Sequence, residues 1–313
     1  MTDKETRCVV LRNIFVLLFI IVTCCASIII FSNIDTSDIV EIEESSTMSS
    51  DSEGGGDWGY SGNNGPDKWP STCHYGKHQS PINIDTRQLL PEKVPRLHFV
   101  NYNRTFENIV GENIGRGVLF TGFSNDKHKA PYVYGGGLPG RYLLYQFHFH
   151  WSRRFSNGSE HTINFVHYPV EIHMVHIRED LTLEEAYNAT DGVAVLAIFG
   201  VFDNEGKALK QIAPHFEQLQ HGGDNTTFNY TPGALLPENK TMFYHYEGSL
   251  TTPGCFETVD WLIFHEPVSI THSQLDELRE VEIIGRPDAD TRPTQPINDR
   301  HVSDCAAVLS GDH

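Results

Sequence analysis

Several signatures of common protein classes are missing from this 313-residue sequence. Six cysteines occur, but no two have Cys-x-x-Cys spacing, which argues against a cysteine zinc site and a thioredoxin-like redox motif. No His-Glu-x-x-His motif is present, which argues against a zinc protease of that type. Basic residues do not balance the acidic ones, and the net charge of −18 argues against a nucleic-acid partner because such a surface repels phosphates.

A long apolar run lies near the N-terminus. Residues 14–31 contain no charge, follow a basic tail over 1–13 and precede several acidic residues. A membrane helix needs roughly 20 apolar residues, and its basic flank stays in the cytoplasm. We therefore expect a transmembrane signal-anchor that leaves the bulk of the chain outside the cell. The alternative is secretion after signal cleavage near Cys24, Cys25 and Ala26, although the apolar run continues past that point.

Composition divides the remainder of the chain. Residues 32–56 are rich in Ser, Asp, Glu and Gly, so we expect a flexible acidic linker that cannot fold by itself. From Asp57 onward aromatic and β-branched residues increase without a second linker, which predicts one domain over 57–305 and a C-terminal tail over 306–313. The tail has no hydrophobic stretch, so no C-terminal lipid anchor is expected.

Short apolar or alternating segments predict the fold class. Residues 142–151, 169–177, 193–202 and 259–265 have patterns typical of strands, whereas helical signals are few. The clearest helical signal is a capping box that begins at Thr182. We expect a mainly β (α+β) single domain with a large central, mostly antiparallel twisted sheet and a few short peripheral helices.

Six Asn-x-Ser/Thr sequons support export independently of the apolar run. A single sequon often arises by chance, but six in a chain with an export signal favour glycosylated surface loops. The predicted acceptors are Asn103, Asn157, Asn188, Asn225, Asn229 and Asn239.

One predicted strand carries two histidines at alternate positions. Side chains on a strand alternate between two faces, so Gln146, His148 and His150 share one face while the aromatic residues between them occupy the other. This pattern is typical of a core strand that presents nitrogen ligands to a cavity. Two histidines that merely line a polar sheet face would give the same pattern.

A second predicted strand adds a third imidazole. Glu171, His173 and Val175 share one face, whereas His176 faces away and is expected to be a buried histidine with its hydrogen bonds satisfied. Three neutral imidazoles leave a fourth tetrahedral position open, which is the arrangement of a catalytic rather than a structural zinc site.

Several segments resemble segments of the α-carbonic anhydrases and occur in the same order. The resemblance is to family members of the extracellular, membrane-associated type. Residues 146–151, 159–161 and 171–176 resemble the metal-binding segments of that family, and residues 249–253 resemble its substrate-side loop. The likeness covers about residues 57–300. Further matching segments are Trp58–Tyr60, Gln79–Ile84, Asp191–Leu196 and Arg292–Pro296.

The resemblance implies one catalytic Zn²⁺ held by His148, His150 and His173, with Gln146 and Glu171 orienting the imidazoles. It implies reversible hydration of carbon dioxide to bicarbonate and a proton, through attack of zinc-bound hydroxide. Carbon dioxide and bicarbonate would then be the natural ligands, and sulfonamide-type inhibitors are expected to bind. The domain over 57–305 would be the catalytic domain.

The resemblance also assigns the substrate side of the site. Thr251 is similar to the family's gate residue, which accepts a proton from the hydroxide and donates its own to Glu160. Tyr60 and Tyr246 match family tyrosines near that gate. Residues similar to the family's apolar wall and bicarbonate contact are Val175, Val195, Leu250, Trp261 and Thr252.

Two cysteines and one isoleucine need separate comment. By resemblance to secreted members, Cys73 pairs with Cys255 as a disulfide, which leaves Cys305 either free or joined to another chain. Ile114 stands where fast members carry a proton-shuttling histidine, and an isoleucine cannot relay a proton. Slow intramolecular proton transfer, or transfer to external buffer or another histidine, is therefore expected.

The alternative function is a catalytically inactive carbonic anhydrase-like extracellular binding module. Such modules usually lose a zinc-binding histidine, and all three are present in this chain. The sequence leaves open whether the chain forms an oligomer.

Overall fold

The computed structural model describes residues 58–307, apart from 71, 124–125, 154–156 and 286. The predicted cytoplasmic tail, signal-anchor and linker, and most of the C-terminal tail, lie outside these residues and stay predictions. Among the described residues no helix has the length and apolar character needed to cross a membrane. The described part of the chain forms a single domain.

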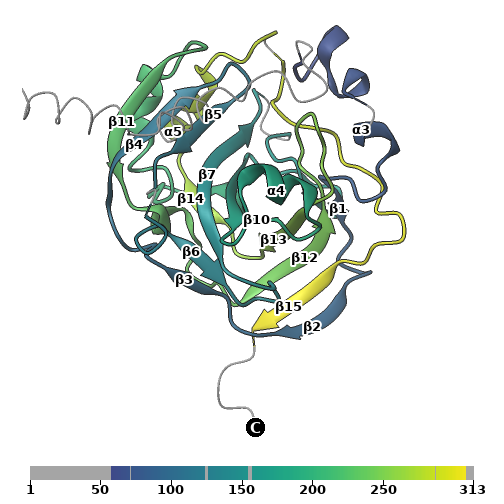
Figure 1. Ribbon diagram of the computed structural model, residues 1–313. Coiled ribbons are helices and arrows are strands. Elements are labelled where there is room, and N and C mark those ends of the chain that lie inside the picture. Colours follow the sequence, from purple (N-terminus) through teal and green to yellow (C-terminus); the bar gives the residue numbers. More distant parts are fainter. Residues whose placement is uncertain (1–57, 71, 124–125, 154–156, 286, 308–313) are drawn as a thin grey trace, which may run out of the picture. The chain divides into compact units, whose positions relative to one another are not determined.

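A thirteen-stranded twisted sheet dominates the part of the chain that is described (Figure 1). Its main path runs through β11 (Asn225–Tyr230), β4 (Phe106–Asn113), β5 (Val118–Thr121), β7 (Tyr142–Trp151), β9 (Val170–Arg178), β10 (Val193–Phe202), β13 (Val259–Phe264), β12 (Met242–Gly248), β15 (Ser303–Ala307) and β2 (Leu90–Val94). Three short strands pair beside this path: β3 (His98–Val100), β6 (Tyr132–Tyr134) and β14 (Val268–Ile270).

Most neighbouring strands are antiparallel, as the sequence predicts. The sheet is nevertheless mixed, because β10 is parallel to both β13 and β14, and β15 is parallel to β2. A separate two-stranded parallel pair joins β1 (Asn83–Ile84) to β8 (Thr162–Ile163).

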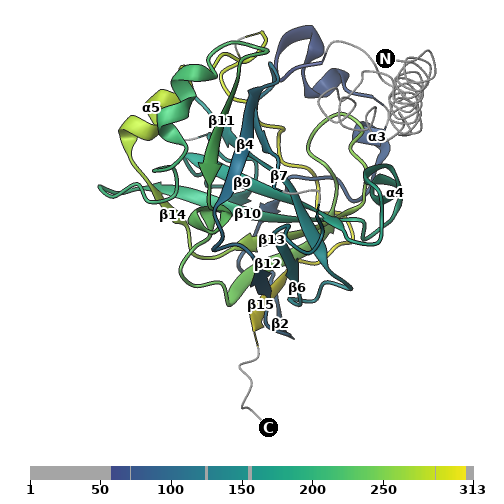
Figure 2. The same cartoon turned by 60° about the vertical axis from the view of Figure 1, so that its left-hand side comes forward.

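The helices are short and peripheral, and Figure 2 shows α4 and α5 well apart at the outside of the sheet. Their bounds are α3 (Thr72–Tyr75), α4 (Leu183–Asn188) and α5 (His272–Arg279), with 3₁₀ turns over Gly62–Asn64, Pro66–Lys68, Ala213–Gln218 and Pro232–Leu235. The predicted capping box begins α4: the Thr182 hydroxyl accepts from the Glu185 backbone N–H, and the Glu185 carboxylate accepts from the Thr182 backbone N–H.

Alternation along the strands separates two apolar clusters. On β7 and β9, aromatic and aliphatic residues such as Phe147, Phe149 and Ile172 pack into one large cluster. Val175 and Ile177 pack into a second cluster together with Trp261 of β13. The side chains of His148, His150 and His173 share the strand face of this second cluster, because strand residues two apart point the same way.

A disulfide ties the start of the domain to the loop that follows β12. Cys73 and Cys255 are bonded across a sequence separation of 182 residues, as the resemblance implied. Cys305 is a free, buried cysteine on β15.

Candidate metal centre

Three histidine nitrogens converge at the junction of β7 and β9. The antiparallel register places His148 directly opposite His173, and His150 lies two residues further along β7. One ligand nitrogen from each ring lies within 4.8 Å of the other two. His150 and His173 are buried, and His148 is partly buried. The structure thus brings together the three residues that the sequence singled out.

Hydrogen bonds behind the rings determine which nitrogens of the β7 histidines are available. The Nδ1–H of His148 donates to Oε1 of Gln146 at 2.8 Å, and the Nδ1–H of His150 donates to the backbone oxygen of Asp290 at 2.8 Å. Both rings therefore keep Nε2 as the nitrogen with a free lone pair. Outer partners of this kind fix the tautomer and the orientation of metal-binding imidazoles.

The third histidine is turned the other way. Nε2–H of His173 donates to Oε1 of Glu171 at 2.8 Å, which leaves Nδ1 for the shared centre. The same carboxylate oxygen accepts from Nδ1 of His161 at 2.6 Å, and Nε2 of His161 is hydrogen-bonded to the Tyr246 hydroxyl at 2.7 Å. The series of hydrogen bonds continues from the Tyr246 hydroxyl, which donates to the Ser80 hydroxyl. Ser80, His161 and Tyr246 come from segments far apart in the sequence, so the sequence did not reveal these hydrogen bonds.

Burial and charge set the protonation of these groups. Burial lowers the pKa of His148, and the neighbouring histidines lower it further. Burial also lowers the pKa of His173 against the opposing effect of the Glu171 carboxylate. Burial opposes a charge on His150 too, but the carboxylates of Glu160 and Asp290 outweigh it and raise that pKa. Two of the three rings are thus held neutral, which is the state that binds a metal.

Two buried polar atoms at this centre lack a hydrogen-bond partner. Nε2 of His150 and Oε2 of Glu160 are both buried without one, and they lie 3.4 Å apart. The other carboxylate oxygen of Glu160 accepts from the backbone N–H of Arg292 at 2.8 Å. Buried polar atoms normally find partners, so the buried Nε2 of His150 points to a group that binds at this centre, and the buried Oε2 of Glu160 points to a donor that is still to be placed. Three nitrogen donors beside a carboxylate fit Zn²⁺.

The comparisons agree with this geometry. The model of the eukaryotic-type carbonic anhydrase family matches residues 64–306. The chain belongs to this carbonic anhydrase family. Hydration of carbon dioxide is the general activity of the family, and its members depend on zinc.

Three relatives are similar to most of this chain. Two come from Caenorhabditis elegans: "Putative carbonic anhydrase 5", 41% identical over 78% of this chain and 80% of the relative, and "Putative carbonic anhydrase 3", 39% identical over 79% and 97%. The third, human carbonic anhydrase 3, is 31% identical over 79% of this chain and 97% of its own length.

The residues of the apolar wall that was assigned by resemblance lie beside the three histidines. Val195 on β10 is paired in register with Val175 on one side and with Trp261 on the other. The Trp261 ring lies 4.8 Å from the His173 ring, centre to centre, and Leu250 packs against the same cluster. These four residues therefore form one apolar surface next to the metal centre.

Backbone hydrogen bonds within the loop that bears Thr251 hold it closed. The Leu250 N–H donates to the Phe256 oxygen at 3.0 Å, and the Cys255 N–H donates to the Thr252 oxygen at 3.0 Å. Thr251 is buried and Thr252 is partly exposed. Since Oε2 of Glu160 has no partner in the described structure, the predicted bond from the Thr251 hydroxyl to that oxygen stays a prediction.

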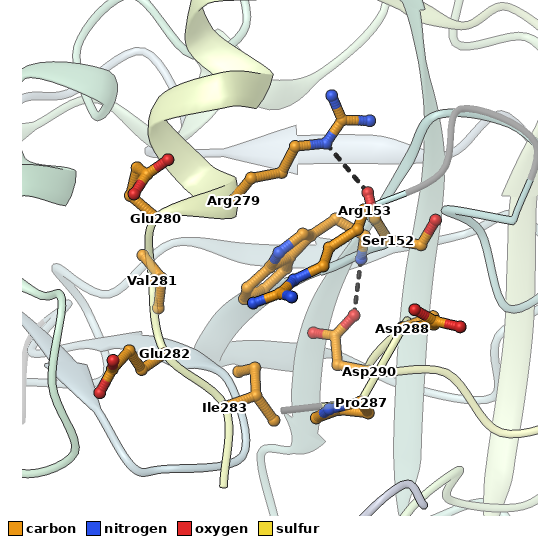
Figure 3. A pocket seen from close by; sticks show the side chains of 12 residues that line it. Ser152, Arg153, Arg279, Glu280, Val281, Glu282, Ile283, Pro287, Asp288 and Asp290 are labelled. Atoms are coloured by element: carbon orange, nitrogen blue, oxygen red, sulfur yellow. Dashed lines mark hydrogen bonds between the residues drawn. The ribbon is translucent and has the colours of Figure 1, made fainter. Parts of the chain in front are cut away.

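A separate cavity of about 430 Å³ lies outside the metal centre (Figure 3). Asp290 lines it and connects it to the site, because its carboxylate accepts from the Trp151 backbone N–H at 2.7 Å while its backbone oxygen accepts from His150. None of the three histidines lines this cavity. Burial raises the pKa of Asp290 to about 7. The sequence did not indicate a role for this residue, since only its backbone oxygen contacts a histidine.

Proposed function

We propose that this chain is an active zinc-dependent carbonic anhydrase that hydrates carbon dioxide reversibly to bicarbonate and a proton. The observation that carries the proposal is the convergence of one ring nitrogen from each of His148, His150 and His173 within 4.8 Å, while the other nitrogen of each ring donates to a separate acceptor. A binding module would not need this complete set of ligands and outer partners.

Zn²⁺ bound by these nitrogens would act as a Lewis acid that lowers the pKa of a contacting water, chemistry for which carbonic anhydrase is the standard example. The protein supplies neutral imidazoles, so the charge of the ion is not cancelled by its ligands. Gln146, Glu171 and the Asp290 backbone hold the rings in place.

The substrate side orients the reactants. Carbon dioxide is apolar, and the surface formed by Val175, Val195 and Trp261 gives it an apolar place beside the nucleophile. The Thr251 hydroxyl donates a hydrogen bond to the Glu160 carboxylate. The Thr251 oxygen then accepts a hydrogen bond from the nucleophile and so orients it towards the substrate carbon. Thr252 contacts product bicarbonate at the more exposed end of the loop. The buried carboxylate oxygen of Glu160 without a partner supports this arrangement.

Position 114 has no histidine to carry away the proton that hydration releases. Ile114 is 40% exposed in the turn after β4 and has no group that titrates. We propose that external buffer accepts the proton and that intramolecular transfer is slow. Added imidazole should then raise turnover, and a turnover that does not respond to imidazole would contradict the buffer route.

We further propose a single-pass membrane protein with an extracellular catalytic domain that binds sulfonamide-type inhibitors. The apolar run over 14–31 and the six sequons support this placement. All six acceptor asparagines are exposed, which is compatible with glycosylation. Sequencing the mature N-terminus distinguishes a retained anchor from secretion after cleavage.

The decisive test compares zinc content and carbon dioxide hydration in the full-length protein and in His148→Ala. We expect the variant to lose one equivalent of zinc and essentially all hydration. His128→Ala is the matched control, because His128 is exposed and outside the site, and it should behave as wild type. Full hydration by His148→Ala would refute the site assignment.

A further inference from the structure

A second group of potential metal ligands lies near the β2 end of the sheet. Figure 1 shows β15 in yellow between β12 and the edge strand β2, and the same strands lie together in Figure 2. Cys305 of β15 is paired in register with Glu92 of β2 on one side and with Phe243 of β12 on the other. His245 is two residues beyond Phe243, so its side chain points to the same face. Three adjacent strands thus direct a carboxylate, a thiol and an imidazole to one place.

The distances match a shared metal ion. One ligand atom each from Glu92, His245 and Cys305 lies within 4.8 Å of the other two, and Sγ of Cys305 is 3.9 Å from Oε2 of Glu92. A tetrahedral zinc ion with Zn–S of about 2.3 Å and Zn–O of about 2.1 Å holds sulfur and oxygen roughly 3.6 Å apart. A movement of a few tenths of an ångström at the exposed Glu92 side chain would bring this sulfur–oxygen pair to that separation, and a fourth position would be left for water.

We propose that Glu92, His245 and Cys305 form a second metal site that binds Zn²⁺ or a similar thiophilic divalent cation. Thiolate, imidazole and carboxylate together favour zinc over magnesium or calcium, which prefer oxygen ligands alone. Binding forms the metal–sulfur bond and releases the thiol proton to solvent. A thiolate and a carboxylate then balance the two positive charges, so the complex is neutral at a partly buried position.

An outer carboxylate supports the imidazole. Oδ1 of Asp260 accepts from Nε2–H of His245 at 3.1 Å, which leaves Nδ1 with the free lone pair. The strand order places Asp260, on β13, on the side of β12 opposite to β15. A carboxylate behind a histidine is the usual support for a metal-binding imidazole.

The second site is distinct from the catalytic one. The two groups share no residue, and they lie on opposite faces of the sheet. Phe243, Leu262 and Cys305 belong to the large apolar cluster, whereas Tyr246 and Trp261 belong to the cluster beside the catalytic histidines. An ion at the second site therefore does not take part in hydration. It would fasten the exposed edge strand β2 to β15 and β12.

Cadmium provides the test, because thiolate–cadmium coordination gives an ultraviolet charge-transfer absorption that a three-histidine site cannot produce. The background is the full-length protein with Cys8, Cys24 and Cys25 changed to serine. Cys73 and Cys255 are bonded to each other, so Cys305 is then the only thiol. We expect one equivalent of thiolate-bound Cd²⁺, displaced by excess Zn²⁺, and no such absorption after Cys305→Ala.

Two further variants keep the test informative if Cys305→Ala does not fold. Glu92→Gln changes an exposed side chain and should weaken Cd²⁺ binding at least tenfold, and Asp260→Asn should weaken it about 10- to 100-fold. Asp304→Asn is the matched control: this carboxylate adjoins Cys305 in sequence but lies 3.1 Å from Nε2 of His265. Asp304→Asn should not weaken Cd²⁺ binding, because the Asp304 charge opposes loss of the Cys305 thiol proton. Absence of the absorption in the background, its persistence in Cys305→Ala, or equal effects of Glu92→Gln and Asp304→Asn would overturn the proposal.

Discussion

At the scale of single residues, the structure separates histidines that bind from histidines that pack. His173 and His176 are three residues apart on β9 but face opposite sides of the sheet. Nδ1–H of His176 donates to the Ala194 backbone oxygen at 3.2 Å, and its Nε2 accepts from the Tyr102 hydroxyl. The sequence predicted a satisfied buried histidine at 176, and these two bonds confirm it. Both nitrogens are occupied, so the ring has no lone pair for a metal.

This buried ring makes the fold sensitive to acid. Burial lowers the pKa of His176 to about 4 from an ordinary value of 6.5. Between these values the unfolded chain binds more protons than the folded one, so stability falls as pH drops from about 6.5 towards 4. The loss amounts to roughly 3 kcal/mol of unfolding free energy for this group. Stability above pH 6.5 is unaffected by this group.

The measurement is the slope of unfolding free energy against pH, from denaturant titrations between pH 4 and 7. His176→Gln keeps a donor and an acceptor but cannot titrate, so its slope should be smaller than that of wild type. The absolute stability of the variant does not enter the comparison. An unchanged slope would show that other groups cause the acid sensitivity.

At the scale of elements, the turn between β4 and β5 carries Ile114, the residue to which we attribute slow proton transfer in the proposed function. Ile114 N–H donates to the Gly117 oxygen at 3.1 Å, and the Ile114 side chain projects to solvent with 40% of its surface exposed. A polar side chain should therefore fit there without disturbing the core.

Ile114→His is expected to raise turnover roughly severalfold in dilute buffer, because an imidazole titrates near neutral pH and carries protons to solvent. The gain should disappear in concentrated buffer, where external molecules accept the proton. Ile114→Gln, polar but without a titrating group, is the control and should show no gain. Stopped-flow hydration over a range of buffer concentrations measures the effect; no gain from histidine in dilute buffer would remove this turn from the proton route.

At the scale of the whole molecule, the disulfide joins the first segments of the domain to the loop that carries Thr251. Cys255 is fully buried, and around the bond Arg292 donates to the backbone oxygens of Cys73 and Ser80. The closed loop spans most of the domain, so the bond restricts the unfolded chain strongly.

Removal of this bond by Cys73→Ser with Cys255→Ser should lower the free energy of unfolding by about 5 kcal/mol in the chain-entropy model. Calorimetry should show a lower Tm for the double variant, and reduction of the wild-type protein should give a similar decrease. Below the new Tm, hydration should persist, since neither cysteine touches the metal centre. A Tm equal to that of the oxidised wild type would contradict the expected contribution.

The sequence by itself determined the family, the mainly β class and the three histidines. Alternation along a strand is a local property, so residues 146, 148 and 150 could be placed on one face from their spacing alone. The resemblance named Gln146 and Glu171 behind two of the rings, but only the tertiary structure showed the Asp290 backbone oxygen behind His150. Tyr246 contacts His161 and Asp290 contacts His150 across long separations in the chain, and no local pattern specifies such contacts. The same holds for Cys305, whose neighbours Glu92 and His245 adjoin it only because β15 pairs with β2 on one edge and β12 on the other.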